Sequence, residues 1–303
     1  MRNEESIRKR LRALVRGKGA VLPGAFNALT ARLVQEAGFK GVYISGAGLN
    51  NGAGYPDIGM LTLSEFATMA RYIARATDLP CVCDADTGFG EAVNVSRCVQ
   101  EFEQAGLAGL HIEDQVFPKR CGHLSGKQLI PSEQMERKIK TAVLSRRDPN
   151  FLLIARTDAR SVESFGAAVK RAKAYLKAGA DAIFPAALKT REEFAAFAKA
   201  VKGPLLANMT EFGVSPLLNA EDLLGMGYKL VIYPMGAFRI TMKACGEFYS
   251  EIARKGTQEG LLPKMQTRKE LYELLDYDSY ARLDEKAYGG FMGGKHLKEK
   301  KRK

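Results

Sequence analysis

The segment Lys119-Arg120-Cys121-Gly122-His123 places a thiol between two cations and an imidazole. Nearby cations favour the thiolate form of a cysteine, which suits it to moving protons or attacking carbon. Most isolated cysteines are buried apolar residues, but here the neighbours are polar and a predicted strand ends shortly before, at Ile112. We therefore expect Cys121, Lys119 and His123 to be catalytic.

Two carboxylates, Asp84 and Asp86, follow another apolar run. Residues two apart in a strand point to the same side, so both carboxylates are expected to face one point. Such a pair favours a hard cation, Mg²⁺ or Mn²⁺, unless one aspartate instead caps a turn. Glu113, on the next predicted strand, could join the ion directly or through water. The same alternation turns Cys81 and Cys83 towards the helices, which argues against a cysteine metal site.

Groups that bind carboxylates follow other predicted strands. Arg156 either grips two oxygens of a substrate or pairs internally with Asp84, Glu113 or Asp158. His111 shares a strand face with Glu113 and is either functional or an interior histidine whose hydrogen bonds are satisfied. Further candidates for binding anions are Ser45 and Gly46, through a hydroxyl and backbone N–H groups, and the guanidinium groups of Arg239 and Arg268. A cation, these groups and a thiol together suit a small di- or tricarboxylate that reacts through an enolate-like intermediate.

The elements that must position these residues alternate between short apolar strands and helices. The eight predicted strands span residues 20–23, 41–45, 80–85, 109–112, 152–156, 182–184, 204–207 and 230–233. Eight such units are the number that closes an α/β (β/α)₈ TIM barrel, whose reactive residues lie at the carboxyl ends of the strands. An open doubly wound sheet is disfavoured because Pro23-Gly24-Ala25-Phe26-Asn27 is not a G-x-G-x-x-G phosphate loop.

The two ends of the chain carry most of the net charge of +12. We expect a basic helix within residues 1–18, the barrel over 19–255, and a helical extension with a basic tail over 256–303. Charged ends of this kind are usually solvated. No aromatic residues interleave with the lysines of 295–303, so we do not expect nucleic-acid binding.

The remaining composition is typical of a cytoplasmic protein. No apolar run approaches the roughly 18 residues that span a bilayer, and residues 1–5 lack the apolar core of a secretory signal. Five cysteines without such a signal indicate a reducing compartment. We expect no membrane association.

Motifs along most of the chain resemble those of the isocitrate lyase and phosphoenolpyruvate mutase superfamily. Beyond the Cys121 segment, they are Tyr43-Ile44-Ser45-Gly46, Pro56-Asp57-Ile58-Gly59, Asp84-Ala85-Asp86-Thr87-Gly88-Phe89-Gly90, His111-Ile112-Glu113-Asp114-Gln115, Ala155-Arg156-Thr157-Asp158-Ala159, Asn208-Met209-Thr210-Glu211-Phe212-Gly213 and Met265-Gln266-Thr267-Arg268. The Cys121 segment is specific to the lyase-like branch, and the others are shared more widely. The resemblance implies a Mg²⁺-dependent carbon–carbon lyase that cleaves 2-methylisocitrate to pyruvate and succinate, in the methylcitrate cycle of propionate catabolism. Cleavage of another diacid, such as dimethylmalate or oxaloacetate, and binding of a dicarboxylate without turnover are the alternatives.

The resemblance also implies roles for individual residues. Tyr43 would take the hydroxyl proton that starts cleavage, and Cys121 would protonate the departing succinate enolate, helped by Lys119 and His123. Mg²⁺ would bind Asp84 and Asp86, with Glu113 in the outer shell. The substrate-binding residues would be Ser45, Gly46, Ala47, Gly122, Arg156, Asn208, Thr210, Arg239 and Arg268. The surrounding layer would include Asp57, His111, Phe184, Ala186 and Ile232, of which Phe184 and Ile232 would admit the extra methyl group. The family assembles as a homotetramer with exchanged C-terminal helices.

One position departs from the family pattern. After the sixth strand the family usually has Phe-Pro-Glu, with the glutamate near the metal and substrate, but this chain has Phe184-Pro185-Ala186. A methyl group can bind neither an ion nor a hydroxyl. We expect the two aspartates still to hold Mg²⁺, and turnover to be reduced.

Overall fold

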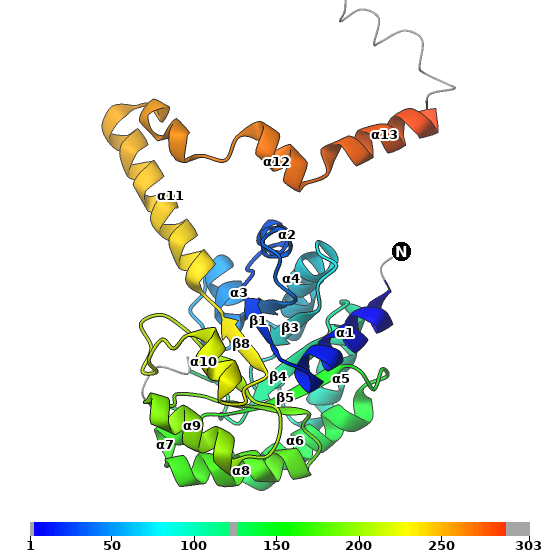
Figure 1. The fold of residues 1–303 in the computed structure, drawn as a ribbon, viewed down its shortest axis with the longest axis vertical. Coiled ribbons are helices and arrows are strands. Elements are labelled where there is room, and N and C mark those ends of the chain that lie inside the picture. The colour runs from blue at the N-terminus through cyan, green and yellow to red at the C-terminus, as the bar shows by residue number, and fades with distance from the viewer. Residues whose placement is uncertain (1–2, 121–125, 289–303) are drawn as a thin grey trace, which may run out of the picture. The chain divides into compact units, whose positions relative to one another are not determined.

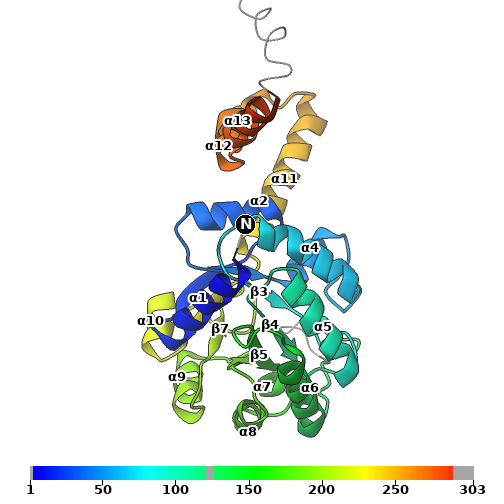
Figure 2. The same cartoon turned by 90° about the vertical axis from the view of Figure 1, so that its right-hand side faces the viewer.

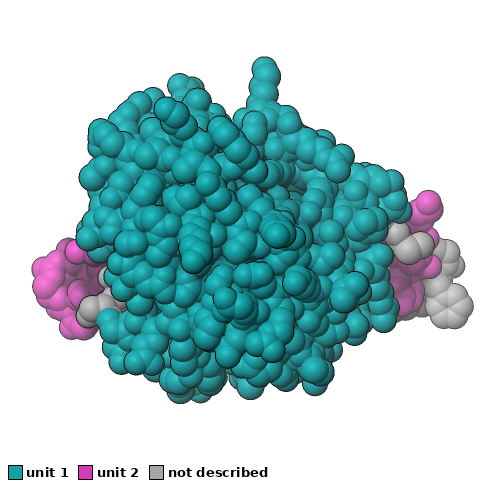
Figure 3. All heavy atoms as spheres, turned by 90° about the horizontal axis from the view of Figure 1, so that it is seen from below, with its two compact units in different colours: residues 1–242 teal, residues 243–303 magenta. Residues whose placement is uncertain are grey.

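The computed structural model describes residues 3–120 and 126–288. The chain divides into two compact units, Met1–Met242 and Lys243–Lys303 (Figure 3). The catalytic candidates Cys121 and His123, the binding candidate Gly122 and the basic tail at 295–303 lie outside the described residues. Among the described residues, no helix is long and apolar enough to cross a membrane.

Eight parallel strands form a barrel within the described part of the first unit (Figures 1 and 2). One sheet contains, in order, β2 (Val42–Ile44), β3 (Cys81–Asp84), β4 (Gly109–Glu113), β5 (Leu152–Thr157) and β6 (Ala182–Pro185). The other contains β1 (Ala20–Pro23), β8 (Leu230–Tyr233) and β7 (Leu206–Asn208). Parallel bridges from Gly24 to Tyr43 and from Ile183 to Leu205 join the two sheets into a ring. The (β/α)₈ prediction is confirmed.

Helices follow the strands and surround the barrel (Figure 2). They are α2 (Ala28–Glu36), α3 (Gly46–Gly52), α4 (Leu63–Arg75), α5 (Ala92–Gln104), α6 (Ser132–Ser145), α7 (Ala159–Val162), α8 (Phe165–Lys177), α9 (Arg191–Ala200) and α10 (Ala220–Gly225). Side-chain caps at Asn27, Thr62 and Thr190 bind the first-turn N–H groups of α2, α4 and α9. The short helices α3 and α7 are not predicted by the sequence pattern. They begin within two residues of the ends of β2 and β5, where the site residues cluster.

Alternation along the strands divides the core into two layers. Leu22, Tyr43, Val82 and Ile154 belong to the cluster inside the barrel. Ile44, Cys81, Cys83 and Leu110 belong to the cluster between strands and helices. The expectation that both cysteines face the helices is therefore confirmed, and their side chains are fully buried.

The first helix, α1 (Glu4–Arg16), packs against the interior of the barrel. Its apolar residues Ile7, Leu11 and Val15 are buried in the same cluster as the strand residues of the barrel interior. The expectation of a solvated basic face is wrong for Arg8 and Arg12. Arg8 is buried and donates to the carbonyl oxygens of Leu107 and Glu103, while Arg12 pairs with Asp181 at 2.7 Å. These arginines therefore bind the end of α5 and the loops before β4 and β6.

The second unit is helical. The helix α11 (Gly236–Lys255) begins in the first unit and ends in the second, followed by the 3₁₀ helix η1 (Glu259–Lys264), α12 (Arg268–Leu274) and α13 (Tyr277–Tyr288). None of the residues in these four helices is buried. Large apolar side chains are exposed instead, among them Tyr249, Tyr280 and Leu283. These helices have no core of their own within the described residues.

Candidate active site

A cavity of about 410 Å³ lies at the carboxyl ends of the barrel strands. It is lined by many of the predicted site residues: Tyr43, Ser45, Ala47, Asp57, Asp84, Arg156, Phe184, Ala186, Asn208, Thr210 and Arg239. These residues come from β2, β3, β5, β6, β7, α3 and α11 or from the loops that follow the strands. The structure therefore brings together side chains that are almost 200 positions apart in the sequence.

The two aspartates of the predicted metal site converge, but not through strand alternation. β3 ends at Asp84, and Asp86 lies beyond it with a left-handed φ of 46°. Asp84 Oδ1 accepts a hydrogen bond from the Asp86 N–H at 3.0 Å, so it also caps this turn. A Cβ atom at Gly46 would lie 2.9 Å from Asp84 Oδ2 and 3.2 Å from Asp86 Oδ1. Both carboxylates thus face one small space that a side chain at position 46 would fill.

Lys119 is buried against these carboxylates. Its Nζ lies 2.8 Å from Asp86 Oδ1 and also pairs with Asp57. Burial alone would lower the pKa of Lys119, but Asp86, Glu113, Asp57 and Asp84 together hold it well above its ordinary value. Lys119 therefore stays charged and contacts the carboxylate cluster directly.

The charges of this cluster fit a divalent cation. Asp57, Asp84 and Asp86 carry three negative charges when ionised, against the single positive charge of Lys119. Burial and the neighbouring Asp84 raise the pKa of Asp86 to about 7, although Lys119 lowers it. Asp86 Oδ2 and Glu113 Oε1 are buried and have no hydrogen-bond partner among the described residues. These oxygens and the excess negative charge are suited to Mg²⁺, which prefers oxygen ligands.

No group of three or more His, Cys, Asp or Glu side chains is arranged around one metal position in the described ranges 3–120 and 126–288. Mg²⁺ keeps several of its waters and commonly binds one or two protein carboxylates. The two aspartates therefore fit Mg²⁺ better than they fit a metal enclosed by protein ligands.

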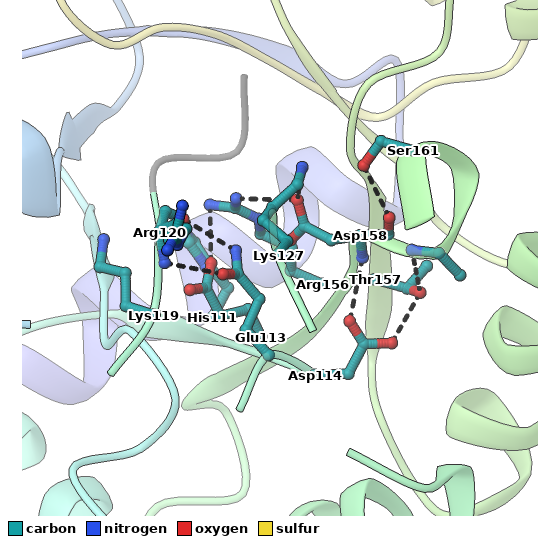
Figure 4. Close-up of polar contacts among 12 residues, drawn as sticks. His111, Glu113, Asp114, Lys119, Arg120, Lys127, Arg156, Thr157, Asp158 and Ser161 are labelled. Atoms are coloured by element: carbon teal, nitrogen blue, oxygen red, sulfur yellow. Dashed lines mark hydrogen bonds and ion pairs between the residues drawn. The ribbon is translucent and has the colours of Figure 1, made fainter. Parts of the chain in front are cut away.

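Arg156 lies between two acidic partners (Figure 4). Its Nη1 is 2.9 Å from Glu113 Oε2, and its Nε donates to Asp158 Oδ2 at 3.0 Å. The guanidinium also lies over the ring of Phe184, with 5.1 Å between its central carbon and the ring centroid. The internal pairing anticipated as an alternative is thus present. Arg156 nevertheless lines the cavity, so the two interpretations are compatible.

A second buried acid holds the turn that carries Asp158. Asp114 Oδ1 accepts from the Asp158 N–H at 2.9 Å, and Asp114 Oδ2 accepts from Thr157 Oγ1 at 2.7 Å and from Tyr175 Oη at 2.8 Å. These bonds anchor the end of β5 to β4 and α8. The position of Arg156, two residues before Asp158, is therefore fixed by three separate elements.

Tyr43 and His111 form a polar pair inside the barrel. The Tyr43 hydroxyl lies 2.7 Å from His111 Nε2, and His111 Nδ1 lies 3.6 Å from Asp84 Oδ1. Burial lowers the pKa of His111 to about 4, so its imidazole is neutral near pH 7. Burial and the charge of Asp84 raise the pKa of Tyr43 well above its ordinary value. His111 is therefore connected to the cavity through Tyr43, which favours its functional interpretation.

Other predicted residues lie elsewhere. Ile232 is buried inside the barrel and does not line the cavity. Arg268 begins α12 and belongs to the second unit.

Sequence reasoning missed several residues of the site. Lys127, whose Nζ lies 2.8 Å from Asp158 Oδ1, had no signal beyond its closeness to the Cys121 segment. Glu211 directly follows Thr210 in a segment already singled out, so its position was the available signal. It lines the cavity and its Oε2 lies 3.5 Å from Arg239 Nε. Asn51 and Met235 also line the cavity, and no pattern of residue types marked them.

The comparisons with known proteins agree with this geometry. Residues 11–253 match the family described as phosphoenolpyruvate phosphomutase. The chain belongs to the phosphoenolpyruvate phosphomutase family. This family member is 50% identical over 275 residues to the 2-methylisocitrate lyase of Aeropyrum pernix, which covers 90% of the chain and 89% of that protein.

Solved structures of the superfamily have the same fold as this phosphoenolpyruvate phosphomutase family member. The crystal structure of 2,3-dimethylmalate lyase, a member of the PEP mutase/isocitrate lyase superfamily, has a TM-score of 0.88 and 33% identity, covering 98% of this chain and 100% of that chain. The crystal structure of phosphonopyruvate hydrolase with oxalate and Mg²⁺ has a TM-score of 0.84 and 34% identity, covering 93% and 98%. The resemblance derived from the sequence motifs is confirmed.

Proposed function

We propose that this chain is a carbon–carbon lyase that cleaves 2-methylisocitrate to pyruvate and succinate. The observation that carries the proposal is a cavity lined by Asp84 and Arg156, with the buried Asp86 facing the same small space as Asp84. Such a cavity suits a hydroxy acid that binds a divalent cation through oxygens and an arginine through a carboxylate. The half-identical 2-methylisocitrate lyase indicates which hydroxy acid it is.

The cation of this proposal is Mg²⁺, with Mn²⁺ as the alternative. Asp84 and Asp86 would hold it, and Glu113 would contact it through water. When bound, Mg²⁺ stabilises negative charge on a substrate oxygen. The superfamily structure with oxalate and Mg²⁺ supports a cation at such a site in a related enzyme.

The proposed reaction begins and ends with proton transfers by residues of this chain. Tyr43 takes the proton of the substrate hydroxyl, and the C–O bond becomes the carbonyl of pyruvate as the adjacent C–C bond breaks. The bonding electrons move into the succinate fragment as an enolate. Cys121, with Lys119 and His123 nearby in sequence, then donates a proton to that carbon. Because the raised pKa of Tyr43 keeps its own hydroxyl protonated, Tyr43 takes the substrate's proton as it passes its own proton to neutral His111 Nε2, 2.7 Å away.

Cavity-lining groups would hold the substrate's carboxylates and hydroxyl. Those in the described residues are Ser45, Ala47, Arg156, Asn208, Thr210 and Arg239. Gly46 would contribute its backbone N–H, and Gly122 and Arg268 stay predictions. Phe184 supplies an apolar wall beside Arg156 for the substrate's methyl group.

We further propose a homotetramer in which the C-terminal helices are exchanged between subunits. The exposed Tyr249, Tyr280 and Leu283 support packing of these helices against another copy, because large apolar surfaces of this kind mark interaction sites. We also propose that the chain divides into a basic helix over 1–18, the barrel over 19–255 and an extension over 256–303. The proposed reaction would belong to the methylcitrate cycle.

A second candidate, favoured by Ala186, is the cleavage of a related diacid. Ala186 lines the cavity where the resemblance leads one to expect a glutamate. The missing carboxylate leaves room and removes a negative charge, which alters the preference among diacids. The relevant competitors are dimethylmalate and oxaloacetate.

The deciding experiment is product analysis of purified protein with racemic 2-methylisocitrate and Mg²⁺. We expect pyruvate and succinate in equal amounts, no product with a chelator, and slower cleavage of dimethylmalate and oxaloacetate. Cys121→Ser should abolish turnover without preventing binding of succinate. Full activity in Cys121→Ser would contradict the acid role, and faster cleavage of another diacid would favour the second candidate.

A further inference from the structure

Lys127 is a buried cation that the proposed reaction does not use. Its side chain is only 2% exposed, and its Nζ lies 2.8 Å from Asp158 Oδ1, on a carboxylate that is fully buried. Burying a lysine is costly unless its charge is paired. The position therefore calls for a reason beyond general stability.

Lys127 is one of four connected charged side chains, of which Arg156 lines the cavity (Figure 4). Glu113 Oε2 lies 2.9 Å from Arg156 Nη1, Arg156 Nε donates to Asp158 Oδ2 at 3.0 Å, and Asp158 Oδ1 contacts Lys127. Burial alone would raise the pKa of Asp158, but Arg156 and Lys127 lower it to about 2, so it stays ionised. Burial raises the pKa of Glu113 well above its ordinary value, but its 2.9 Å contact with Arg156 favours the ionised form. With Glu113 ionised, two negative and two positive charges balance.

Removing Lys127 would leave this set with one excess negative charge. Arg156 is the member of the set that lines the cavity, and the cavity receives an anionic substrate. An uncancelled charge on Asp158 would repel that anion and hold the guanidinium more strongly. In the structure, Lys127 shares Asp158 Oδ1 with Arg156 Nη2, whose contact is the longer one at 3.3 Å.

We propose that Lys127 is a positioning residue that cancels the charge of Asp158 and thereby keeps Arg156 available to a carboxylate of the substrate. This inference rests on the proposed function, in which Arg156 binds such a carboxylate. The competing explanation is that Lys127 only anchors its own segment to the barrel. The backbone of Asp158 is held independently by Asp114, so removing Lys127 leaves that turn in place.

A double-mutant cycle separates the two explanations. The variants are Lys127→Met, Asp158→Asn and their combination, and the probe is succinate, titrated calorimetrically in the presence of Mg²⁺. A unit charge near a partly buried anion changes affinity on the order of tenfold. We expect Lys127→Met to weaken succinate binding and raise KM about tenfold, with kcat changed less than about threefold. The double variant restores neutrality and should recover affinity to within about threefold of the wild type.

The opposite result identifies a merely structural role. Succinate affinity unchanged in Lys127→Met, or weaker in the double variant than in Lys127→Met, would overturn the proposal. Lys127→Arg keeps the charge and should bind succinate like the wild type, even if Lys127→Met proves unstable. Arg146→Met is the matched control, because it removes a partly buried cation from Asp181, before β6, and should leave affinity unchanged. If the wild type binds succinate but does not cleave 2-methylisocitrate, the proposed function fails while the cycle still tests Lys127.

Discussion

The two ends of the barrel contain charged clusters, partly buried at the amino end and buried at the carboxyl end, whose hydrogen bonds are satisfied differently. At the amino end, just before β6, Asp181 accepts from Arg12 at 2.7 and 2.8 Å, from Arg146 at 2.6 Å and from the Leu153 N–H at 2.9 Å. At the carboxyl end, Asp86 Oδ2 and Glu113 Oε1 are buried without a hydrogen-bond partner among the described residues. Buried polar groups are normally paired, and exceptions often mark functional sites. The amino end thus contributes stability, whereas the carboxyl end keeps capacity for a ligand.

Asp84→Asn should have the largest effect, because it removes one of the two converging carboxylates. We expect kcat to fall about a thousandfold or more, since stabilisation of charge on a substrate oxygen would be lost. Thermal unfolding should show only a small loss of stability, because the asparagine Oδ1 can still accept from the Asp86 N–H, while the charge contacts that lower the pKa of Asp84 are lost.

The control for this variant is the response to Mg²⁺. A ligand that binds only the folded state raises its stability, by about 2.7 kcal/mol at a hundredfold excess over Kd. Mg²⁺ should therefore raise the Tm of the wild type but not that of Asp84→Asn. An equal rise in both would place the cation elsewhere.

Asp181→Ala should do the reverse at the other end of the barrel. It leaves two arginines and a backbone N–H without their acceptor, which should lower the free energy of unfolding by about 3 kcal/mol. Once folded at 25 °C, the variant should keep its kcat/KM, because Asp181 is remote from the strand ends that form the cavity. Chemical denaturation and steady-state kinetics measure the two quantities.

Glu101→Gln is the matched control for this loss of stability. Glu101 pairs with Arg97 at 3.6 Å on the exposed face of α5, and such surface pairs contribute about 0–1 kcal/mol. If Asp181→Ala destabilised the protein no more than Glu101→Gln does, the amino-end pairs would not be stabilising.

Asp158 belongs to the carboxyl end, but both of its carboxylate oxygens are paired. The pH dependence of the protein's stability should show this pairing. Its pKa is about 2, below the ordinary 3.8, so the unfolded chain binds a proton at higher pH than the folded chain does. The resulting stability is fully present above about pH 5 and is lost as the pH falls through about 2. Between about pH 5 and pH 2, the free energy of unfolding of Asp158→Asn should fall by about 2 kcal/mol less than that of the wild type. If the free energy of unfolding fell by the same amount in the wild type and the variant, the pairing of Asp158 would be contradicted.

Ala186→Glu should have the smallest effect. It adds a carboxylate at the carboxyl end of the barrel, where Asp84→Asn removes one. The cavity already has excess negative charge before a cation binds. We expect the rate of 2-methylisocitrate cleavage with Mg²⁺ to rise about tenfold, as for the addition of one general acid–base or positioning group. Ala186→Gln, of similar size without the charge, is the control. No rise in Ala186→Glu would show that this position does not limit turnover.

The strand order, the two-layer core and the collection of polar residues at the strand ends could be predicted from the sequence. Strand alternation correctly sorted Cys81 and Cys83 into the outer layer, because a side chain's face depends only on local geometry. The same reasoning reached the right pair of aspartates for a partly wrong reason, since β3 ends at Asp84. The left-handed turn at Asp86, not strand alternation, turns the two carboxylates together.

The chain by itself determined which chemical groups are present and near which strand ends they lie. Only the tertiary structure decided which of them meet: Lys119 with Asp86, Lys127 with Asp158, and Tyr43 with His111. Each of these pairs joins different strands or the loops that follow them, so its geometry depends on how the strands are arranged in the barrel rather than on local spacing. The charge balance also depends on the tertiary structure, because whether a buried carboxylate has a partner depends on the positions of residues that are distant in the sequence.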